Sequence, residues 1–140
     1  MSKCIALIVG AGRGQRFGDE TPKQYHMLDG VSIIARSIAT FSSNSRIAAV
    51  RAVIHSDDMN LYEDAVKGLS SSKLLEPVQG GTTRQQSVYL GLQSLKNISP
   101  DQVLIHDAAR PFVSTGMINS IIGELKSSRG AIVALSLIHI

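Results

Sequence analysis

The sequence holds a single cysteine among 140 residues, which removes several common kinds of site. Cys4 has no second cysteine with which to form a disulfide within the chain, and no metal site built on several cysteines is possible. A chain without paired cysteines is typical of a reducing compartment, so we expect a cytoplasmic protein.

Long hydrophobic runs and blocks of one charge are also lacking. The first apolar run ends at Gly10, which makes it too short for a signal peptide or a membrane span. The 14 lysines and arginines are spread along the chain, and the formal charge is only +3. We therefore expect neither a membrane nor a nucleic-acid partner, and only a mild preference for anionic ligands.

The apolar residues fall into short runs that alternate with helical patterns. Runs rich in Val and Ile predict buried strands at 4–9, 47–54, 73–78, 102–106 and 131–135. Apolar residues spaced by three and four predict helices over 33–41, 61–69, 88–95 and 117–125. This alternation predicts an α/β fold with a Rossmann-like, mainly parallel sheet and helices on both faces.

Polar segments follow three of the predicted strands directly. They read GAGRGQRFG from Gly10, QGGTTRQQS from Gln79 and DAARP from Asp107. In parallel α/β folds, ligands bind beyond the carboxyl ends of the strands, so we expect the functional residues in these segments.

The glycine-rich segment 10–14 fits neither standard phosphate-binding pattern. A dinucleotide fingerprint needs a third glycine where Gln15 stands, and a P-loop needs two glycines five residues apart. The glycines still allow main-chain N–H groups to approach an anion, and Arg16 and Lys23 add positive charge. The alternative is a glycine turn followed by two solvated cations.

The second segment predicts a tight turn at Gly80 and Gly81 that opens a helix near Thr82. Unpaired N–H groups at a helix start attract anions or the acceptor atoms of a base, and Arg84 and Ser87 fall in the first turns. The alternative is an ordinary helix start with a solvated arginine and a small capping residue.

The third segment places His106, Asp107 and Arg110 at the end of a strand. Isolated histidines at such positions are more often hydrogen-bonded structural residues than bases. Asp107 and Arg110 also fit a local ion pair that fixes the turn before Pro111.

Taken together, the stretches GAGRGQRFGDETPKQY, GGTTRQQSV and HDAARP resemble the 2-C-methyl-D-erythritol 4-phosphate cytidylyltransferases of non-mevalonate isoprenoid biosynthesis. The resemblance runs from about residue 4 to residue 135. The first motif alone indicates only the wider nucleotidyltransferase superfamily, whereas PKQY combined with HDAARP is more restrictive. The resemblance implies an enzyme that binds CTP and Mg²⁺, transfers CMP to the sugar-alcohol phosphate and releases pyrophosphate.

The resemblance also assigns roles to individual residues. It implies catalytic cations at Arg16 and Lys23, a nucleotide loop at Gly10, Ala11, Gly12 and Gly14, cytosine recognition at Gly81, Thr82 and Ser87, and substrate-side roles for Asp107 and Arg110. The family more often has alanine where this chain has Gly10. Mg²⁺ is expected to bind mainly through the phosphates of CTP, with no protein residue assigned as its ligand.

The residues present suit this chemistry. The attacking phosphate oxygen is already ionised at neutral pH, so no general base is required. The reaction needs positive charge at the α-phosphate, which Arg16 and Lys23 would supply together with Mg²⁺. Two alternatives remain: a cytidylyltransferase for another polyol phosphate such as ribitol 5-phosphate, and a non-catalytic nucleotide-binding module. The presence of both cations argues against the second.

The resemblance stops at Ser136, where the family continues with P-V-x-D-T-x-K and this chain reads SLIHI. We therefore expect residues 1–135 to form a partial cytidylyltransferase domain and residues 136–140 to be a non-native tail. The family's homodimer contacts would lie in the missing part, so we expect a homodimer only at full length and no turnover by this chain alone.

Overall fold

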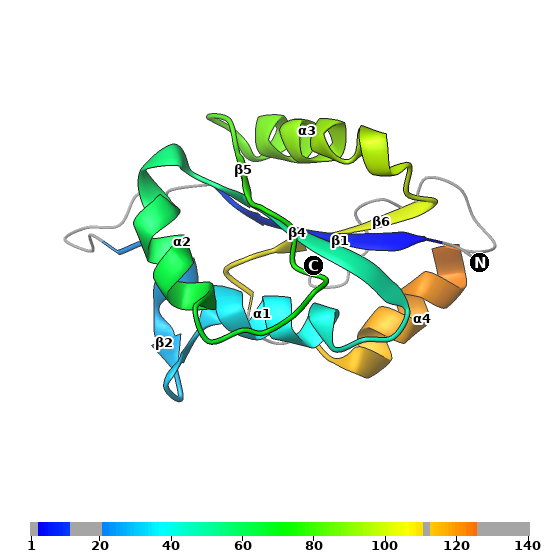
Figure 1. The fold of residues 1–140 in the computed structure, drawn as a ribbon, viewed down its shortest axis with the longest axis horizontal. Helices are drawn as coiled ribbons and strands as arrows, with labels where there is room; N and C mark the ends of the chain where they lie inside the picture. Colours follow the sequence, from blue (N-terminus) through cyan, green and yellow to red (C-terminus); the bar gives the residue numbers. More distant parts are fainter. Residues whose placement is uncertain (1–2, 12–20, 111–112, 126–140) are drawn as a thin grey trace.

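The computed structural model describes residues 3–11, 21–110 and 113–125. The strands of its main sheet are β1 (Cys4–Gly10), β4 (Ile47–Ile54), β5 (Val78–Gln79) and β6 (Gln102–Asp107). The helices are α1 (Ile33–Ser42), α2 (Met59–Val66), α3 (Arg84–Ser94) and α4 (Thr115–Leu125) (Figure 1). A small hairpin of β2 (Met27–Leu28) and β3 (Val31–Ser32) and three short 3₁₀ helices, η1 (Lys23–Tyr25), η2 (Ser56–Asp58) and η3 (Lys96–Ile98), complete the described elements.

The main sheet has the strand order β5-β4-β1-β6, and every pair in it is parallel. In the centre, β1 pairs with β4 on one side and with β6 on the other, so that Val9 lies opposite both Val53 and Asp107. The chain runs outward from β1 to β5 and then returns across the sheet to β6. The carboxyl ends of β1 and β6 are therefore neighbours at the point where the strand order reverses.

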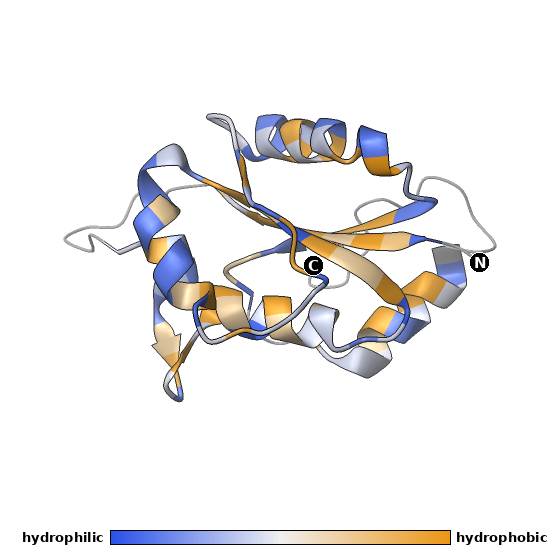
Figure 2. Ribbon diagram, viewed as in Figure 1, coloured by the Kyte–Doolittle hydropathy of each residue, from blue (hydrophilic) through white to orange (hydrophobic). Residues whose placement is uncertain are grey.

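Helices cover both faces of this sheet, which confirms the predicted fold class (Figure 1). One face packs against α1, α2 and α4, through side chains that include Ile38, Tyr62 and Ile118. The other face packs against α3, with Leu92 and Val88 lying on a smaller cluster around Leu7. The hydropathy colouring shows the same arrangement, with apolar strands between helices that are polar on their outer sides (Figure 2).

The sheet-facing side of α3 is shaped for a close approach to the strands. The helix begins after Thr83, whose side-chain oxygen accepts from the main-chain N–H of Gln86. At Gly91 an added Cβ would lie 2.7 Å from Leu7 Cδ2 and 2.8 Å from Val53 Cγ2. Glycine at this position therefore lets α3 lie directly on β1 and β4.

The predicted strand at 73–78 is shorter in the structure. Only Val78–Gln79 forms β5, and upstream the pairing with β4 is reduced to a single bridge between Val50 and Leu74. Pro77 stands between these two contacts and has no N–H to donate, which explains why the ladder is interrupted there. The predicted strand at 131–135 lies outside the described residues.

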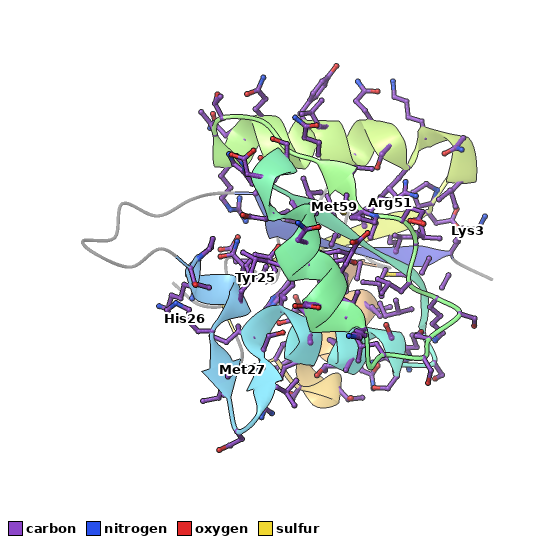
Figure 3. The ribbon with its side chains drawn as sticks, turned by 60° about the vertical axis from the view of Figure 1, so that its left-hand side comes forward. Lys3, Tyr25, His26, Met27, Arg51 and Met59 are labelled. Atoms are coloured by element: carbon purple, nitrogen blue, oxygen red, sulfur yellow. The ribbon has the colours of Figure 1, made fainter. Side chains whose placement is uncertain are left out.

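The β2–β3 hairpin was not predicted. Its turn is formed by Asp29 and Gly30, both with positive φ, as a two-residue turn that matches strand twist requires. Figure 3 shows this hairpin, which carries Met27, projecting at one end of the molecule. Met27 is 70% exposed.

Arg51, also labelled in Figure 3, links elements on the α3 face of the sheet. It comes from β4 and donates to the carbonyl oxygens of Glu76 and Ser94, each at 3.0 Å.

Within the described ranges, no helix has the length and apolar character needed to cross a bilayer.

Candidate active site

A cavity of about 420 Å³ lies beyond the carboxyl ends of β1 and β6. Its lining comes from four separate stretches of the chain and comprises Val9, Gly10, Lys23, Gln24, Arg84, Asp107, Ala109 and Arg110. The cavity is thus at the edge of the sheet where the sequence predicted the functional residues.

Lys23 is presented to this cavity by a segment that is anchored on both sides of it. The lysine is exposed, whereas Pro22, Gln24 and Tyr25 are buried. The Gln24 side-chain amide donates to the carbonyl oxygen of Gly10 at 2.6 Å, which ties η1 to the end of β1. The backbone around Lys23 is therefore fixed by its neighbours, and the lysine itself contributes little to folding.

The end of β1 leaves no room for a larger residue at position 10. An added Cβ on Gly10 would lie 2.8 Å from the Cβ of Ala108, closer than real Cβ contacts allow. Ala108 is itself fixed, because its N–H donates to the carbonyl oxygen of Val9. The glycine is needed here for close packing of two strand ends rather than for an unusual φ.

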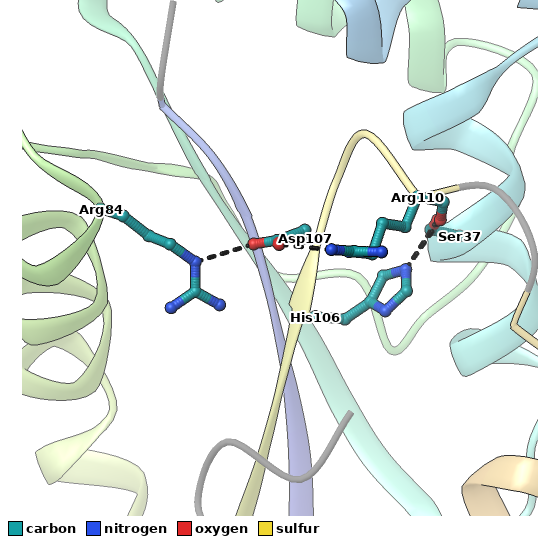
Figure 4. A network of polar contacts seen from close by, with 5 residues as sticks. All are labelled: Ser37, Arg84, His106, Asp107 and Arg110. Carbon is teal, nitrogen blue, oxygen red and sulfur yellow. Dashed lines mark hydrogen bonds and ion pairs between the residues drawn. The ribbon is translucent and has the colours of Figure 1, made fainter. Parts of the chain in front are cut away.

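Asp107 is held between two arginines from different elements (Figure 4). Arg84 Nε donates to Oδ1 of Asp107 at 3.0 Å, and Arg110 Nε lies 3.5 Å from Oδ2. The arginine side chains are each 44% exposed and the aspartate side chain 28%. The structure thus contains the Asp107–Arg110 pair offered as an alternative from sequence, and it adds Arg84 as a second partner.

His106 is a buried structural residue whose ring contacts the main chain. Its side chain is fully buried beside the ring of Phe41, with 5.4 Å between the ring centroids. Its Nε2 atom lies 2.9 Å from the carbonyl oxygen of Arg110, to which Ser37 Oγ also donates. Because a carbonyl oxygen only accepts, Nε2 must carry the proton. The preferred interpretation of His106 as a hydrogen-bonded structural histidine is confirmed.

The residues predicted to recognise a base lie at the start of α3 and hydrogen-bond with one another. The N–H of Gly81 donates to Ser87 Oγ at 3.0 Å, and the N–H of Thr82 donates to Gln86 Oε1 at 2.8 Å. These N–H groups, expected to be open, therefore have internal acceptors in this structure. Among the described residues, Gly81, Thr82 and Ser87 do not line the cavity.

Ala11 links the cavity at the end of β1 to the turn that precedes α3, because it lies against Gly80. It is 2% exposed, and an added Cβ on Gly80 would lie 2.3 Å from the Ala11 Cβ. Ala11, which directly follows β1, is therefore in direct contact with the turn before α3.

The structure thus brings four predicted site residues together around one cavity: Gly10, Lys23, Asp107 and Arg110. Three more, Gly12, Gly14 and Arg16, lie outside the described residues. Arg84 was predicted only as part of a helix start, although its position just after a strand-end turn was a usable signal.

The charges around the cavity favour an anion. Among the described residues, the lining contains three cations, Lys23, Arg84 and Arg110, and a single carboxylate, that of Asp107. The described part of the chain contains no cluster of three or more His, Cys, Asp or Glu residues suited to hold a metal ion. The arrangement can bind and orient phosphate groups, and the cavity offers few ligands for a metal held by protein alone.

A parallel α/β sheet with a cationic cavity at its reversal point defines a Rossmann-like protein for phosphorylated ligands. The sequence profile of the family "IspD: 2-C-methyl-D-erythritol 4-phosphate cytidylyltransferase" matches residues 4–139. The chain belongs to this family.

The similar proteins agree with this assignment. The chain is 54% identical to a bifunctional enzyme IspD/IspF of Paramagnetospirillum magneticum and covers 94% of itself but 34% of that relative. The corresponding enzyme of Rhodospirillum rubrum is 49% identical, with 97% of this chain and 35% of the relative covered. The chain thus spans about a third of the length of these curated relatives.

The fold matches solved structures as well. The structure of a 4-diphosphocytidyl-2C-methyl-D-erythritol synthase from Anaerococcus prevotii superposes with a TM-score of 0.74 at 26% identity, covering 91% of this chain and 52% of that chain. The 2-C-methyl-D-erythritol 4-phosphate cytidylyltransferase of Francisella tularensis gives a TM-score of 0.64 at 26% identity, covering 91% of this chain and 54% of that chain.

Proposed function

We propose that this chain carries the nucleotide-binding part of an enzyme that transfers CMP from CTP to 2-C-methyl-D-erythritol 4-phosphate and releases pyrophosphate. The observation that carries the proposal is the convergence of Gly10, Lys23, Asp107 and Arg110 on one cavity. These residues come from two of the three motifs on which the family resemblance rests, and Arg84, from the third motif, lines the same cavity. Membership of the cytidylyltransferase family supports the choice of reaction.

In this proposal the protein works mainly through positive charge. Lys23 lies exposed on the cavity with its backbone fixed, so it can stabilise negative charge that develops on the α-phosphate during attack. Arg16, which lies outside the described residues, is proposed as the second catalytic cation. The acceptor phosphate is an ionised nucleophile, so no side chain has to remove a proton.

The base would be recognised at the start of α3. The N–H groups of Gly81 and Thr82 already point at oxygen acceptors, those of Ser87 and Gln86. The acceptor atoms of cytosine could replace these internal partners, and the loop of Gly10, Ala11, Gly12 and Gly14 would lie along the nucleotide. Discrimination against uracil would then depend on which buried partners are left unpaired.

The residues present suit a Mg²⁺ ion that is carried by the nucleotide. Asp107 is the only carboxylate among the described residues of the cavity lining, and both of its oxygens are held by arginines. Such a site fits a metal bound mainly through substrate phosphates. When bound, Mg²⁺ would neutralise phosphate charge beside Lys23.

We further propose that the whole enzyme assembles as a homodimer and is located in the cytoplasm. The single thiol, Cys4, is buried and unpaired, which suits a reducing compartment.

The test uses two preparations. The first is the 140-residue chain, titrated calorimetrically with CTP, UTP, ATP and GTP in the presence of Mg²⁺. The second is a chimera in which residues 1–125 replace the matching part of the Paramagnetospirillum magneticum relative, assayed for pyrophosphate release with each nucleotide. We expect selective CTP binding by the chain and CTP-dependent transfer to methylerythritol phosphate by the chimera.

Other outcomes would overturn the proposal in identifiable ways. Equal pyrophosphate release from UTP would remove the assignment to CTP, and a clear preference for ribitol 5-phosphate would move the protein to the related polyol enzymes. CTP binding without transfer in the chimera would indicate a non-catalytic nucleotide-binding module.

A further inference from the structure

Three charged side chains meet at the cavity although they come from different places in the fold. Arg84 is the first residue of α3, Asp107 is the last residue of β6, and Arg110 lies in the turn that follows. Each oxygen of the Asp107 carboxylate faces the Nε atom of a different arginine, at 3.0 Å for Arg84 and 3.5 Å for Arg110 (Figure 4). The shorter and better-defined contact is the one that crosses from helix to strand.

The main chain of Arg110 is fixed independently of this pair. Its carbonyl oxygen lies within hydrogen-bond distance of His106 Nε2 and Ser37 Oγ, and its N–H donates to the carbonyl oxygen of Asp107. Only the side chain of Arg110, which is 44% exposed, is left to adjust. The availability of the Arg110 side chain to a ligand therefore depends on how many of its donors the Asp107 carboxylate engages.

A carboxylate can accept two parallel hydrogen bonds from one guanidinium group. If Arg84 were absent, Oδ1 of Asp107 would be released and the carboxylate could turn both oxygens toward Arg110. The guanidinium group of Arg110 would then be paired with Asp107 of the same turn and would be less available to a ligand. With Arg84 in place, one oxygen is engaged from the α3 side and Arg110 keeps donors for another anion.

We propose that Arg84 is a positioning residue, which holds Asp107 from the α3 side and thereby keeps Arg110 available to the phosphate group of the acceptor substrate. The proposal rests on the proposed function, which supplies the acceptor phosphate. It also links the helix start that carries Gly81, Thr82 and Ser87 to the strand end that carries Asp107 and Arg110.

A simpler role for Arg84 would be direct contact with the phosphate, and the two roles predict different couplings. If Arg84 contacts the phosphate directly, Arg84→Ala lowers phosphate affinity by the same factor whether or not Asp107 is charged. A positioning residue that acts through Asp107 loses its effect once the carboxylate is removed. A double-mutant cycle on Arg84 and Asp107 therefore separates them.

The experiment measures the affinity of the 140-residue chain for inorganic phosphate, for methylerythritol phosphate and for CTP by calorimetry. The variants are Arg84→Ala, Arg84→Lys, Asp107→Asn and the double variant Arg84→Ala with Asp107→Asn. Lys96→Ala serves as the charge control, because Lys96 is exposed and follows the opposite end of α3. Melting temperatures check that every variant is folded.

We expect Arg84→Ala to weaken binding of phosphate and of methylerythritol phosphate about tenfold, but to change CTP affinity less than about twofold. Arg84→Lys, which keeps a charge beside Asp107, should lose less. In the Asp107→Asn background, Arg84→Ala should change phosphate affinity less than about twofold. A spectroscopic signature accompanies this result: the Nε–H of Arg84 should exchange slowly with water in the wild type and faster in Asp107→Asn.

Equal losses from Arg84→Ala in both backgrounds would overturn the proposal in favour of direct contact, and so would a loss confined to CTP. Absence of phosphate binding by the wild-type chain would overturn it as well. Failure of the proposed function looks different, because methylerythritol phosphate would then bind no better than inorganic phosphate and the chimera would transfer no CMP, while the phosphate cycle would still decide the role of Arg84.

Discussion

The imidazole of His106 holds the carbonyl oxygen of Arg110 at 2.9 Å, so a fully buried side chain fixes the backbone of a residue whose own side chain faces the cavity. This relationship divides the HDAARP motif into two parts. His106 determines the path of the turn, whereas Asp107 and Arg110 provide its charge. The two parts should respond differently to substitution.

His106→Leu should lower the free energy of unfolding by about 1–3 kcal/mol, because it removes a buried hydrogen bond to Arg110. His106→Gln should lower it less, because the side-chain amide of glutamine can place an N–H near the position of Nε2. Urea unfolding of both variants measures the difference. Equal losses would mean that His106 stabilises the fold by packing against Phe41 rather than through its hydrogen bond.

Lys23→Ala in the chimera should lower kcat by about a hundredfold or more while leaving the melting temperature close to that of the wild type. The reason is that Lys23 is exposed on the cavity while its neighbours Gln24 and Tyr25 anchor the segment. The same result is expected for Arg16→Ala. Steady-state kinetics and thermal unfolding provide the measurements, with Lys96→Ala as the control, and full turnover by either variant would remove that residue from the mechanism.

Two helical glycines should respond to alanine in opposite directions. Gly91→Ala should destabilise the fold by about 1–3 kcal/mol, because its Cβ would overlap Leu7 and Val53 across the α3–sheet contact. Gly123→Ala, in α4, meets no atom within 4 Å and should stabilise by about 0.5–1 kcal/mol through helix propensity. Urea unfolding of the pair tests this, and a neutral Gly91→Ala would mean that α3 can move away from the sheet without loss.

Stability should fall at alkaline pH because of Cys4. Burial raises the pKa of this thiol from 9.0 to about 11, so the folded state keeps a proton that the unfolded state releases. The stabilisation is complete below pH 9 and is lost as the pH rises from about 9 to 11, by up to about 3 kcal/mol. Unfolding free energies across this range should show a flatter slope for Cys4→Ala than for the wild type, and identical slopes would contradict the assignment to this thiol.

Much of the fold could be predicted from sequence because β1, β4 and β6 are continuous apolar runs. Strands buried on both faces have no room for polar residues, so their limits are visible in composition. The segment at 73–78 has the same composition, but Pro77 interrupts its pairing. The hairpin was missed because its strands are two residues long and only the Asp29–Gly30 turn marks it.

The site was predictable to the extent that its residues follow strands directly. Lys23, Asp107 and Arg110 were placed in the right region, because parallel strands bring their carboxyl ends to one edge. The contact between Arg84 and Asp107 spans 23 residues and joins a helix start to a strand end. No local pattern encodes such a pair, since it depends on how α3 crosses back over the sheet.

The contact between positions 10 and 108 has a consequence for the evolution of the family. With 2.8 Å between a Cβ at position 10 and that of Ala108, the two sites share space for a single methyl group. Relatives with the family's alanine at position 10 beside the alanine of HDAARP must therefore hold these two strand ends several tenths of an ångström further apart than this chain does. The glycine of this chain thus records a closer approach of β1 and β6, which a Gly10→Ala substitution would have to undo.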